Sequence, residues 1–254
     1  MEFQEQVEIM REGGEILAGA LAELKRATVP GKTGAELNLL AEDYIRSHEA
    51  EPAFKNYKPS FSKSAYPYTL CLSVNDIVVH GYPTAEVVLQ EGDVAKLDLG
   101  LKFKGYYLDA AITTPVGRVS SEARRLIEAT RQSLQQALKV TKPGRTLGDI
   151  GWVIESTLAD AGFTSVKSLC GHDIGTYIHG DLQVLNFGDP GTGQKITPGM
   201  FFTIEPMGSI GSDHTIQDDD FVFRTENGSI ATHFEVTLAV HDKGNYVLTP
   251  VLGL

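Results

Sequence analysis

Two aspartates stand inside apolar runs whose pattern predicts β-strands. Asp98 lies in Val-Ala-Lys-Leu-Asp-Leu-Gly, and Asp109 lies in Tyr-Tyr-Leu-Asp-Ala-Ala-Ile. A hairpin with Lys104 and Gly105 as its two-residue loop would make these aspartates diagonal neighbours on one face of a sheet. Two carboxylates on a half-buried face repel and lose hydration, an arrangement that is tolerated when they share a proton or a cation. A pair of solvent-facing acids is the alternative interpretation.

Three further residues interrupt runs of the same kind. Glu205 ends Met-Phe-Phe-Thr-Ile-Glu, Glu235 lies in Thr-His-Phe-Glu-Val-Thr-Leu, and His172 stands in the glycine-flanked loop Cys-Gly-His-Asp-Ile-Gly. Considered singly, the glutamates would suit cap or edge positions, and the histidine would suit a structural position. Together with the two aspartates they form an oxygen-rich ligand set. Such a set suits Mn, Fe or Co, with Zn as an alternative, and bridging carboxylates suit two ions.

A repeated segment indicates which elements position these side chains. Residues 28–33 are Thr-Val-Pro-Gly-Lys-Thr, and residues 141–146 are Thr-Lys-Pro-Gly-Arg-Thr. Self-similarity of this kind indicates a duplicated structural unit. In each copy the last threonine stands three residues before an acid, Glu36 or Asp149, which is the spacing of a capping box that opens a helix. Each copy is therefore predicted to be a helix, a Pro-Gly turn and a second helix.

Short runs rich in Val, Ile, Leu, Phe and Thr are predicted to be strands, at residues 70–79, 94–100, 106–113, 200–205 and 233–240. Helices followed by strands, twice over, predict an α+β fold of two related halves, about residues 1–115 and 116–254, rather than a doubly wound sheet. No flexible linker separates the halves. We therefore expect a single domain with its ligand between the halves.

Composition and missing motifs exclude several classes of protein. The 254 residues carry a net charge of −11, which argues against binding to nucleic acid or to an anionic membrane. The amino-terminal sequence lacks the features of a signal peptide, and no run is long enough to cross a bilayer, so a cytoplasmic protein is expected. A phosphate-binding loop fails because Arg26 stands where its first glycine is required. Cys71 and Cys170 are expected to be reduced thiols.

The motifs and their order resemble the type 1 methionine aminopeptidases, a metallopeptidase family with the pita-bread fold, over essentially the whole chain. The motifs that carry the resemblance are Cys-Leu-Ser-Val-Asn-Asp-Ile-Val-Val-His-Gly from Cys71, the two aspartate runs, Gly-His-x-Ile-Gly from Gly171, Pro-Gly-Met-x-x-x-Ile-Glu-Pro-Met from Pro198, and His-Phe-Glu from His233. The resemblance implies one catalytic α+β domain, in which helices of two pseudo-twofold-related halves pack on a central curved antiparallel sheet.

The resemblance also implies the ligands of two divalent metal ions, which would be Co, Mn, Fe or Zn. The implied ligands are Asp98, Asp109, His172, Glu205 and Glu235. Asp109 and Glu235 would bridge the two ions. These are the same five residues that the strand-embedded acids and the glycine-flanked histidine suggest.

The implied activity is removal of the initiator methionine from nascent proteins when the second residue is small. Two ions bridged by a water molecule would lower its pKa and polarise the substrate carbonyl. Glu205 is the candidate general base, His179 would stabilise the oxyanion, and His80 would contact or protonate the leaving amide nitrogen. Tyr66 and Cys71 would line the pocket for the methionine side chain.

Several residues depart from the family pattern around this pocket. Phe221 stands where a tryptophan commonly closes the pocket. Together with Tyr66, Cys71, His80 and His179 it is expected to bind the substrate. The other departures are Ser64 and Val236 in place of histidines, Ile178 in place of phenylalanine, and Gly180-Asp181-Leu182 in place of Glu-x-Pro. None removes an implied metal ligand. Together they predict a looser pocket and a change in activity or side-chain preference.

The expected partners are the amino-terminal peptides of nascent proteins, with transient contact to the ribosome and no membrane or specific nucleic-acid partner. The expected protein is a monomer of the short bacterial form, because the first predicted helix begins close to Met1. An Xaa-Pro aminopeptidase on the same fold is one alternative, although those enzymes usually carry an additional amino-terminal domain. A non-catalytic binding module is another, although such modules usually lose metal ligands.

Overall fold

The computed structural model describes residues 2–60, 62–251 and 253, and it has the predicted α+β architecture. Its helices are α1 (Phe3–Ala27), α2 (Gly34–Ser47), α3 (Ser121–Val140) and α4 (Leu147–Asp160). Its strands are β1 (Glu51–Pro52), β2 (Leu70–Val74), β3 (Ile77–Val79), β4 (Val94–Phe103), β5 (Tyr106–Pro115), β6 (Thr164–Ser165), β7 (Cys170–Gly171), β8 (Val184–Leu185), β9 (Phe201–Ile204), β10 (Met207–Ser209), β11 (Thr215–Gln217), β12 (Phe223–Thr225), β13 (Ala231–His233), β14 (Val236–His241) and β15 (Gly244–Val247).

The two repeated segments form the predicted pairs of helices. The Pro-Gly turn between α1 and α2 leads into Thr33, whose backbone N–H donates to Glu36 at 2.9 Å, while the Glu36 N–H donates to the Thr33 hydroxyl at 3.3 Å. Between α3 and α4, the Thr146 N–H donates to the Asp149 carboxylate at 2.8 Å. These bonds satisfy amide groups that a helix start leaves without an intrahelical partner.

The predicted hairpin register is confirmed. β4 and β5 pair antiparallel, with Asp98 opposite Ala111 and Asp109 opposite Gly100. Lys104 and Gly105 form the connecting turn and have positive φ values of 47° and 90°, as the tightest hairpin turns require. Asp98 and Asp109 are therefore diagonal neighbours on one face of the sheet.

Two of the predicted strands are divided. Residues 70–79 form β2 and β3, because a turn at Asn75, with a φ of 55°, interrupts them. Residues 233–240 are divided between the end of β13 and most of β14. Phe234 and Glu235 lie between these two strands, and Glu235 forms an isolated antiparallel bridge with Ala111 of β5. This bridge joins the carboxyl-terminal strands to the hairpin that carries the aspartates.

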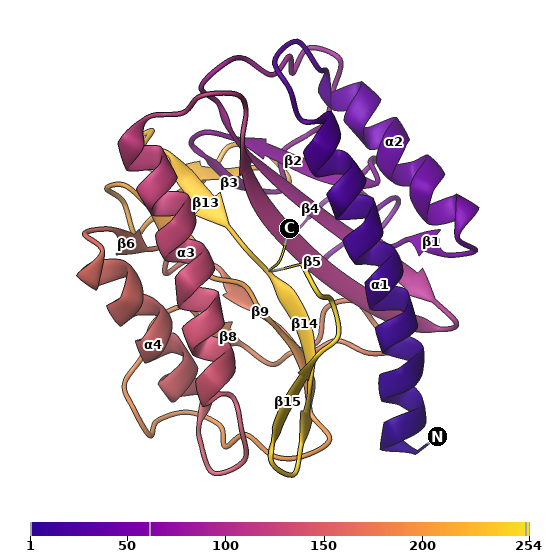
Figure 1. Ribbon diagram of the computed structural model, residues 1–254, viewed down its shortest axis with the longest axis vertical. Helices are drawn as coiled ribbons and strands as arrows, with labels where there is room; N and C mark the ends of the chain where they lie inside the picture. Colours follow the sequence, from indigo (N-terminus) through magenta and orange to yellow (C-terminus); the bar gives the residue numbers. More distant parts are fainter. Residues whose placement is uncertain (1, 61, 252, 254) are drawn as a thin grey trace.

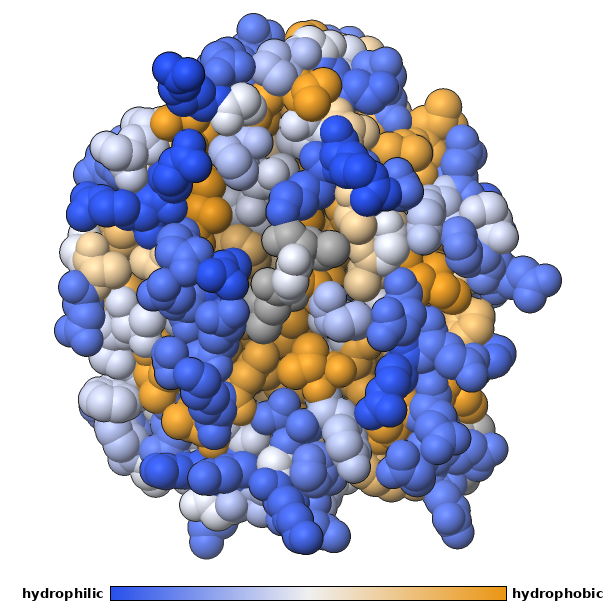
Figure 2. Space-filling model, viewed as in Figure 1, coloured by the Kyte–Doolittle hydropathy of each residue, from blue (hydrophilic) through white to orange (hydrophobic). Residues whose placement is uncertain are grey.

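Helices cover one side of the strands, as Figure 1 shows. The helix α1 packs on β4 and β5, and α3 packs on α4 and contacts β10. One hydrophobic cluster contains buried residues of all four helices and of β4, β5, β9 and β14. In Figure 2 hydrophilic residues cover most of α1 and α3, and hydrophobic residues show mainly between these helices. No helix in the described ranges is both long enough and apolar enough to cross a membrane.

Candidate metal centre

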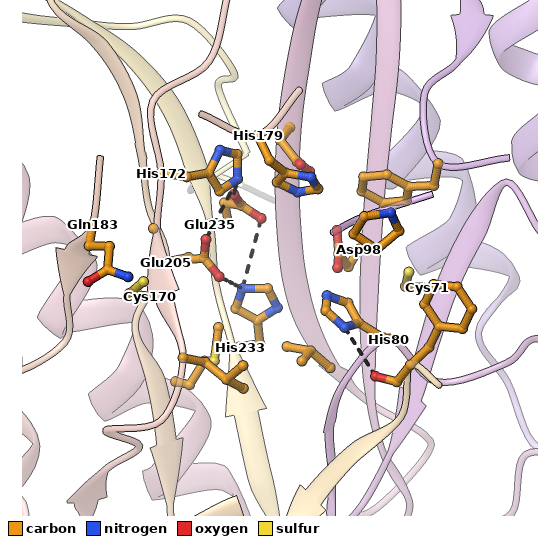
Figure 3. Close-up of a pocket in the computed structure, with 18 of the residues that line it drawn as sticks. Cys71, His80, Asp98, Cys170, His172, His179, Gln183, Glu205, His233 and Glu235 are labelled. Atoms are coloured by element: carbon orange, nitrogen blue, oxygen red, sulfur yellow. Dashed lines mark hydrogen bonds and ion pairs between the residues drawn. The ribbon is translucent and has the colours of Figure 1, made fainter. Parts of the chain in front are cut away.

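A pocket of about 630 Å³ opens where the strands of the two halves meet, and the five predicted metal ligands line it. Asp98 comes from β4 and Asp109 from β5, while His172 follows β7, Glu205 follows β9, and Glu235 precedes β14. Figure 3 shows Asp98 on the hairpin side of the pocket and His172, Glu205 and Glu235 on the opposite side. The site is therefore assembled from both halves of the chain.

The ligand atoms of these five residues form overlapping groups. In one group Asp98, Asp109 and Glu235 each place a carboxylate oxygen within 4.8 Å of the others, and in a second His172, Glu205 and Glu235 do the same with one ligand atom each. Glu235 belongs to both groups. A carboxylate shared in this way suits a bridge between two ions.

The carboxylates of the site are buried and lack the partners that a buried charge needs. Asp98 Oδ1, Asp109 Oδ1 and Glu235 Oε1 have no hydrogen-bond partner among the described residues. Burial raises the pKa of Asp98 and of Glu205 to about 7, and it raises the pKa of Asp109 and Glu235 well above their ordinary values. Neighbouring carboxylates add to the shifts of Asp109 and Glu235. Unpartnered oxygens and mutual repulsion fit a centre that binds divalent cations.

Backbone and hydroxyl contacts fix the ligand side chains. The His172 ring lies with Nδ1 at 3.0 Å from the Asp173 carbonyl, which requires Nδ1–H as the donor and leaves the lone pair on Nε2. The Thr203 hydroxyl accepts from the His172 N–H at 3.1 Å and donates to Glu205 Oε1 at 3.3 Å. The imidazole thus presents Nε2 at 3.9 Å from both Glu205 Oε1 and Glu235 Oε1.

Two other histidines of the predicted set line the same pocket. His80 has a φ of 60°, and its Nδ1 lies 3.2 Å from the Phe221 carbonyl. The His179 ring packs edge-on against His172, with the ring centroids 4.4 Å apart. Desolvation in the pocket lowers the pKa of His80 to about 4, and it lowers the pKa of His179, an exposed residue, below its ordinary value. Both rings are therefore neutral near pH 7.

The predicted side-chain pocket lies next to Asp98. Cys71 stands opposite Asp98 across the β2–β4 pair, and it packs in an aromatic cluster with Tyr66, Ile178 and Phe221. The Tyr66 hydroxyl lies within hydrogen-bond distance of two backbone carbonyls, those of residues 81 (2.8 Å) and 70 (3.1 Å). Because that hydroxyl is engaged with backbone, the rings of Tyr66 and Phe221, 5.2 Å apart, offer mainly apolar surface to a ligand.

Two buried side chains on the strands that lead to the ligands were not predicted from the sequence. His233 is 1% exposed, and its Nε2 lies 3.6 Å from Glu205 Oε2. Lys96 is also 1% exposed, and its ammonium group donates to the Asn75 carbonyl at 2.7 Å. Burial lowers the pKa of Lys96 to about 7 and that of His233 to about 4. Each stands two residues before a predicted ligand, so strand alternation was the signal that could have placed both on the ligand face.

Divalent metal binding is expected to strengthen as the pH rises from about 5 to about 8. The pKa values of Asp98 and Glu205, raised to about 7, mean that these groups hold protons over part of this range. Each proton must leave before an ion binds, so a higher pH favours binding. Calorimetry in buffers of different ionisation enthalpy measures the protons released, and fewer should be released at pH 8 than at pH 6. An affinity that does not change with pH would contradict this assignment of the carboxylates.

Comparisons with known proteins show which family and which solved structure this chain resembles. The model of metallopeptidase family M24 matches residues 8–242. Two curated relatives, both methionine aminopeptidases, are 39% identical over 249 residues (Aquifex aeolicus) and 38% identical over 245 residues (Clostridium acetobutylicum), and in each case the match covers at least 96% of both chains. The solved methionine aminopeptidase of Thermotoga maritima superposes with a TM-score of 0.92 at 37% identity and covers 96% of both chains.

Proposed function

Because this chain belongs to metallopeptidase family M24 and resembles its methionine aminopeptidases along nearly its whole length, we propose that it removes an amino-terminal methionine from nascent proteins when the second residue is small. The observation that carries the proposal is the group of four buried carboxylates and one imidazole at the floor of a substrate-sized pocket. Family membership makes the protein a metal-dependent aminopeptidase. The ligands, the number of ions and the substrate rules below are part of the proposal.

The proposed centre binds two divalent ions, which are Mn, Fe, Co or Zn. Asp98 and Asp109 would hold one ion, His172 and Glu205 would hold the other, and the carboxylates of Asp109 and Glu235 would be shared between them. When bound, two such ions supply Lewis acidity, which activates a water molecule and polarises the substrate carbonyl. Hard carboxylate oxygens with one imidazole favour these metals over soft ones, while the metal loaded in the cell also depends on supply.

The remaining steps belong to side chains of this protein. Glu205 accepts the proton of the attacking water at its carboxylate and returns it to the leaving amide nitrogen as the C–N bond breaks. His179, neutral near pH 7, donates a ring N–H to the oxygen of the tetrahedral intermediate. In His80 the contact of Nδ1 with the Phe221 carbonyl assigns the proton to Nδ1, so the neutral ring presents a lone pair at Nε2 to the amide N–H of the leaving group. The free α-amine of the substrate would bind at the metal centre, which restricts cleavage to the chain end.

The proposed subsite for the methionine side chain is the aromatic cluster beside Asp98. Tyr66, Cys71 and Phe221 line it, and a flexible, polarisable thioether packs well on aromatic rings. Phe221 is smaller than the tryptophan that is common in the family. The subsite is therefore wider than usual in the direction of Phe221, and it should discriminate less sharply between methionine and other unbranched or γ-branched side chains.

Peptide selectivity tests the proposed function. We expect cleavage of Met-Ala peptides, rejection of Met-Lys peptides, and tolerance of leucine or norleucine at the first position. We also expect Phe221→Trp to tighten the preference for methionine over leucine, because pocket differences of about one methylene are worth roughly 1–3 kcal/mol. Measuring kcat/KM for Met-Ala, Leu-Ala, Met-Lys and Ala-Pro peptides in both proteins checks each part.

The outcomes of this panel separate the competing functions. Faster cleavage of Ala-Pro than of Met-Ala would exclude the methionine assignment and favour an Xaa-Pro aminopeptidase. No cleavage of any peptide by the metal-loaded protein would favour a non-catalytic binding module. Unchanged discrimination between methionine and leucine in Phe221→Trp would contradict only the role proposed for Phe221.

We further propose that both halves of the chain work as one catalytic domain and that the enzyme is a monomer in the cytoplasm. The single-domain assignment is supported by a centre that takes Asp98 and Asp109 from the first half and His172, Glu205 and Glu235 from the second. Contact with the ribosome would be transient and local, because a net charge of −11 disfavours a broad electrostatic interaction with RNA.

A further inference from the structure

His233 faces the candidate metal centre and has no part in the proposed mechanism. It ends β13, opposite Met207 of β10. Its backbone is fixed by Thr113, whose hydroxyl accepts from the His233 N–H at 2.9 Å and donates to the His233 carbonyl at 2.6 Å. Figure 3 shows the ring directed toward Glu205 and Glu235. A rigid strand therefore directs this imidazole at the carboxylates.

The ring of His233 is buried without a hydrogen bond. Neither Nδ1 nor Nε2 has a hydrogen-bond partner among the described residues, and a buried polar group in that condition costs free energy. The nearest carboxylate oxygens to Nε2 among its ion-pair contacts are Glu205 Oε2 at 3.6 Å and Glu235 Oε2 at 3.9 Å. Both separations exceed a hydrogen bond. An imidazole that served only for packing would gain nothing from this placement.

Two imidazoles contact opposite sides of the same pair of carboxylates. His172 Nε2 lies 3.9 Å from the Oε1 atoms of Glu205 and Glu235, whereas His233 Nε2 faces the Oε2 atoms of both. His172 belongs to groups of possible ligand atoms within 4.8 Å of one another, and within the described part of the chain no such group contains His233. The Oε1 atoms of both glutamates thus face His172, and their Oε2 atoms face His233.

We propose that His233 is a positioning residue of the metal centre: its Nε2–H donates to the outer oxygens of Glu205 and Glu235 and holds their Oε1 atoms toward His172. The inference rests on the proposed function, because it assigns these glutamates as ligands. Hydrogen bonds to the outer oxygen of a ligating carboxylate fix its orientation, and their loss typically costs about 10- to 100-fold in metal affinity or activity.

Two substitutions and a control test this role. His233→Leu removes the N–H donor and keeps a similar side-chain volume. His233→Gln replaces the ring N–H donor with a side-chain amide N–H donor. Thr232→Val, in the same strand, is the control, because it removes a buried hydroxyl contact with Thr130 (2.7 Å) away from the centre. The measurements are calorimetric titration of chelator-treated proteins with Mn²⁺ and the visible spectrum of their Co²⁺ forms.

His233→Leu is expected to bind Mn²⁺ about 10- to 100-fold more weakly than wild type. His233→Gln should recover most of the affinity and keep the wild-type Co²⁺ spectrum, and Thr232→Val should bind as wild type. Metal-free His233→Leu should melt at least as high as wild type, because the substitution breaks no existing hydrogen bond. That result would separate positioning from a general loss of stability.

Three results would overturn the inference. Wild-type affinity in His233→Leu would mean that the ring does not position the ligands. Equal loss in both His233 variants, with a changed Co²⁺ spectrum in His233→Gln, would make the ring a direct ligand. An equal loss in Thr232→Val would attribute the effect to the strand. A wild-type protein that binds no divalent ion would contradict the proposed function as well, so the two failures are distinguishable.

Discussion

Asp109→Asn and Glu235→Gln are each expected to abolish measurable peptide hydrolysis while leaving the protein folded. Each substitution removes one charge from a carboxylate that the proposal places between two ions, and an amide oxygen is a weaker bridge than a carboxylate. The fold should survive because both carboxylates are buried with raised pKa values. Replacing them with neutral amides relieves repulsion in the metal-free protein.

Asp181→Asn supplies the matched control for these variants. Asp181 lines the same pocket, is exposed, and belongs to none of the ligand groups found in the described ranges. It should keep nearly wild-type activity and metal affinity. Activity measured with circular dichroism and thermal melting separates loss of the centre from unfolding. Substantial turnover in both bridging variants would refute the assignment of the bridge.

His179→Ala is expected to lower kcat by roughly 100- to 1,000-fold, about 3 kcal/mol of transition-state stabilisation, with metal binding retained. The ring lines the pocket and packs against His172. In the proposed mechanism it stabilises the developing oxyanion and does not ligate a metal ion. An effect confined to the transition state lowers kcat and leaves KM nearly unchanged. Steady-state kinetics with metal content measured on the same sample checks both parts.

His179→Gln is a useful companion, since an amide N–H replaces the ring donor and should restore part of the lost kcat. An unchanged kcat in His179→Ala would refute the oxyanion role. Loss of metal from His179→Ala would instead indicate that His179 is a metal ligand. That alternative has a structural basis, because Asp109, His172 and His179 each place a ligand atom within 4.8 Å of the others.

Local patterns predicted much of the fold correctly. The hairpin register followed from a two-residue loop at Lys104 and Gly105, because a strand period of two leaves no choice of face once the turn is fixed. The repeated Pro-Gly segments predicted both helix pairs. The break between Val74 and Ile77 was not predicted, since an apolar run gives no sign that Asn75 adopts a positive φ.

The sequence could name candidate site residues, but it could not give their arrangement. Burying a charged side chain costs free energy, so a charged residue within an apolar run indicates a functional role. On this basis Asp98, Asp109 and Glu235 could be selected from the sequence. His233 and Lys96 belong to the same strand faces and were missed. A single histidine or lysine is usually explained by solvent exposure, and only the folded chain shows that both are buried and that His233 Nε2 lies 3.6 Å from Glu205 Oε2.

Release of methionine during metal titration tests whether divalent ions are required for removal of the amino-terminal methionine. Chelator-treated protein is supplied with a Met-Gly-Met-Met peptide while Mn²⁺ is added stepwise, and free methionine is identified by mass spectrometry. We expect no release without metal, release of the first residue alone when metal is present, and calorimetric saturation at two ions per chain. Methionine released in excess chelator, or no methionine released by fully loaded protein, would contradict the proposed metal-dependent activity.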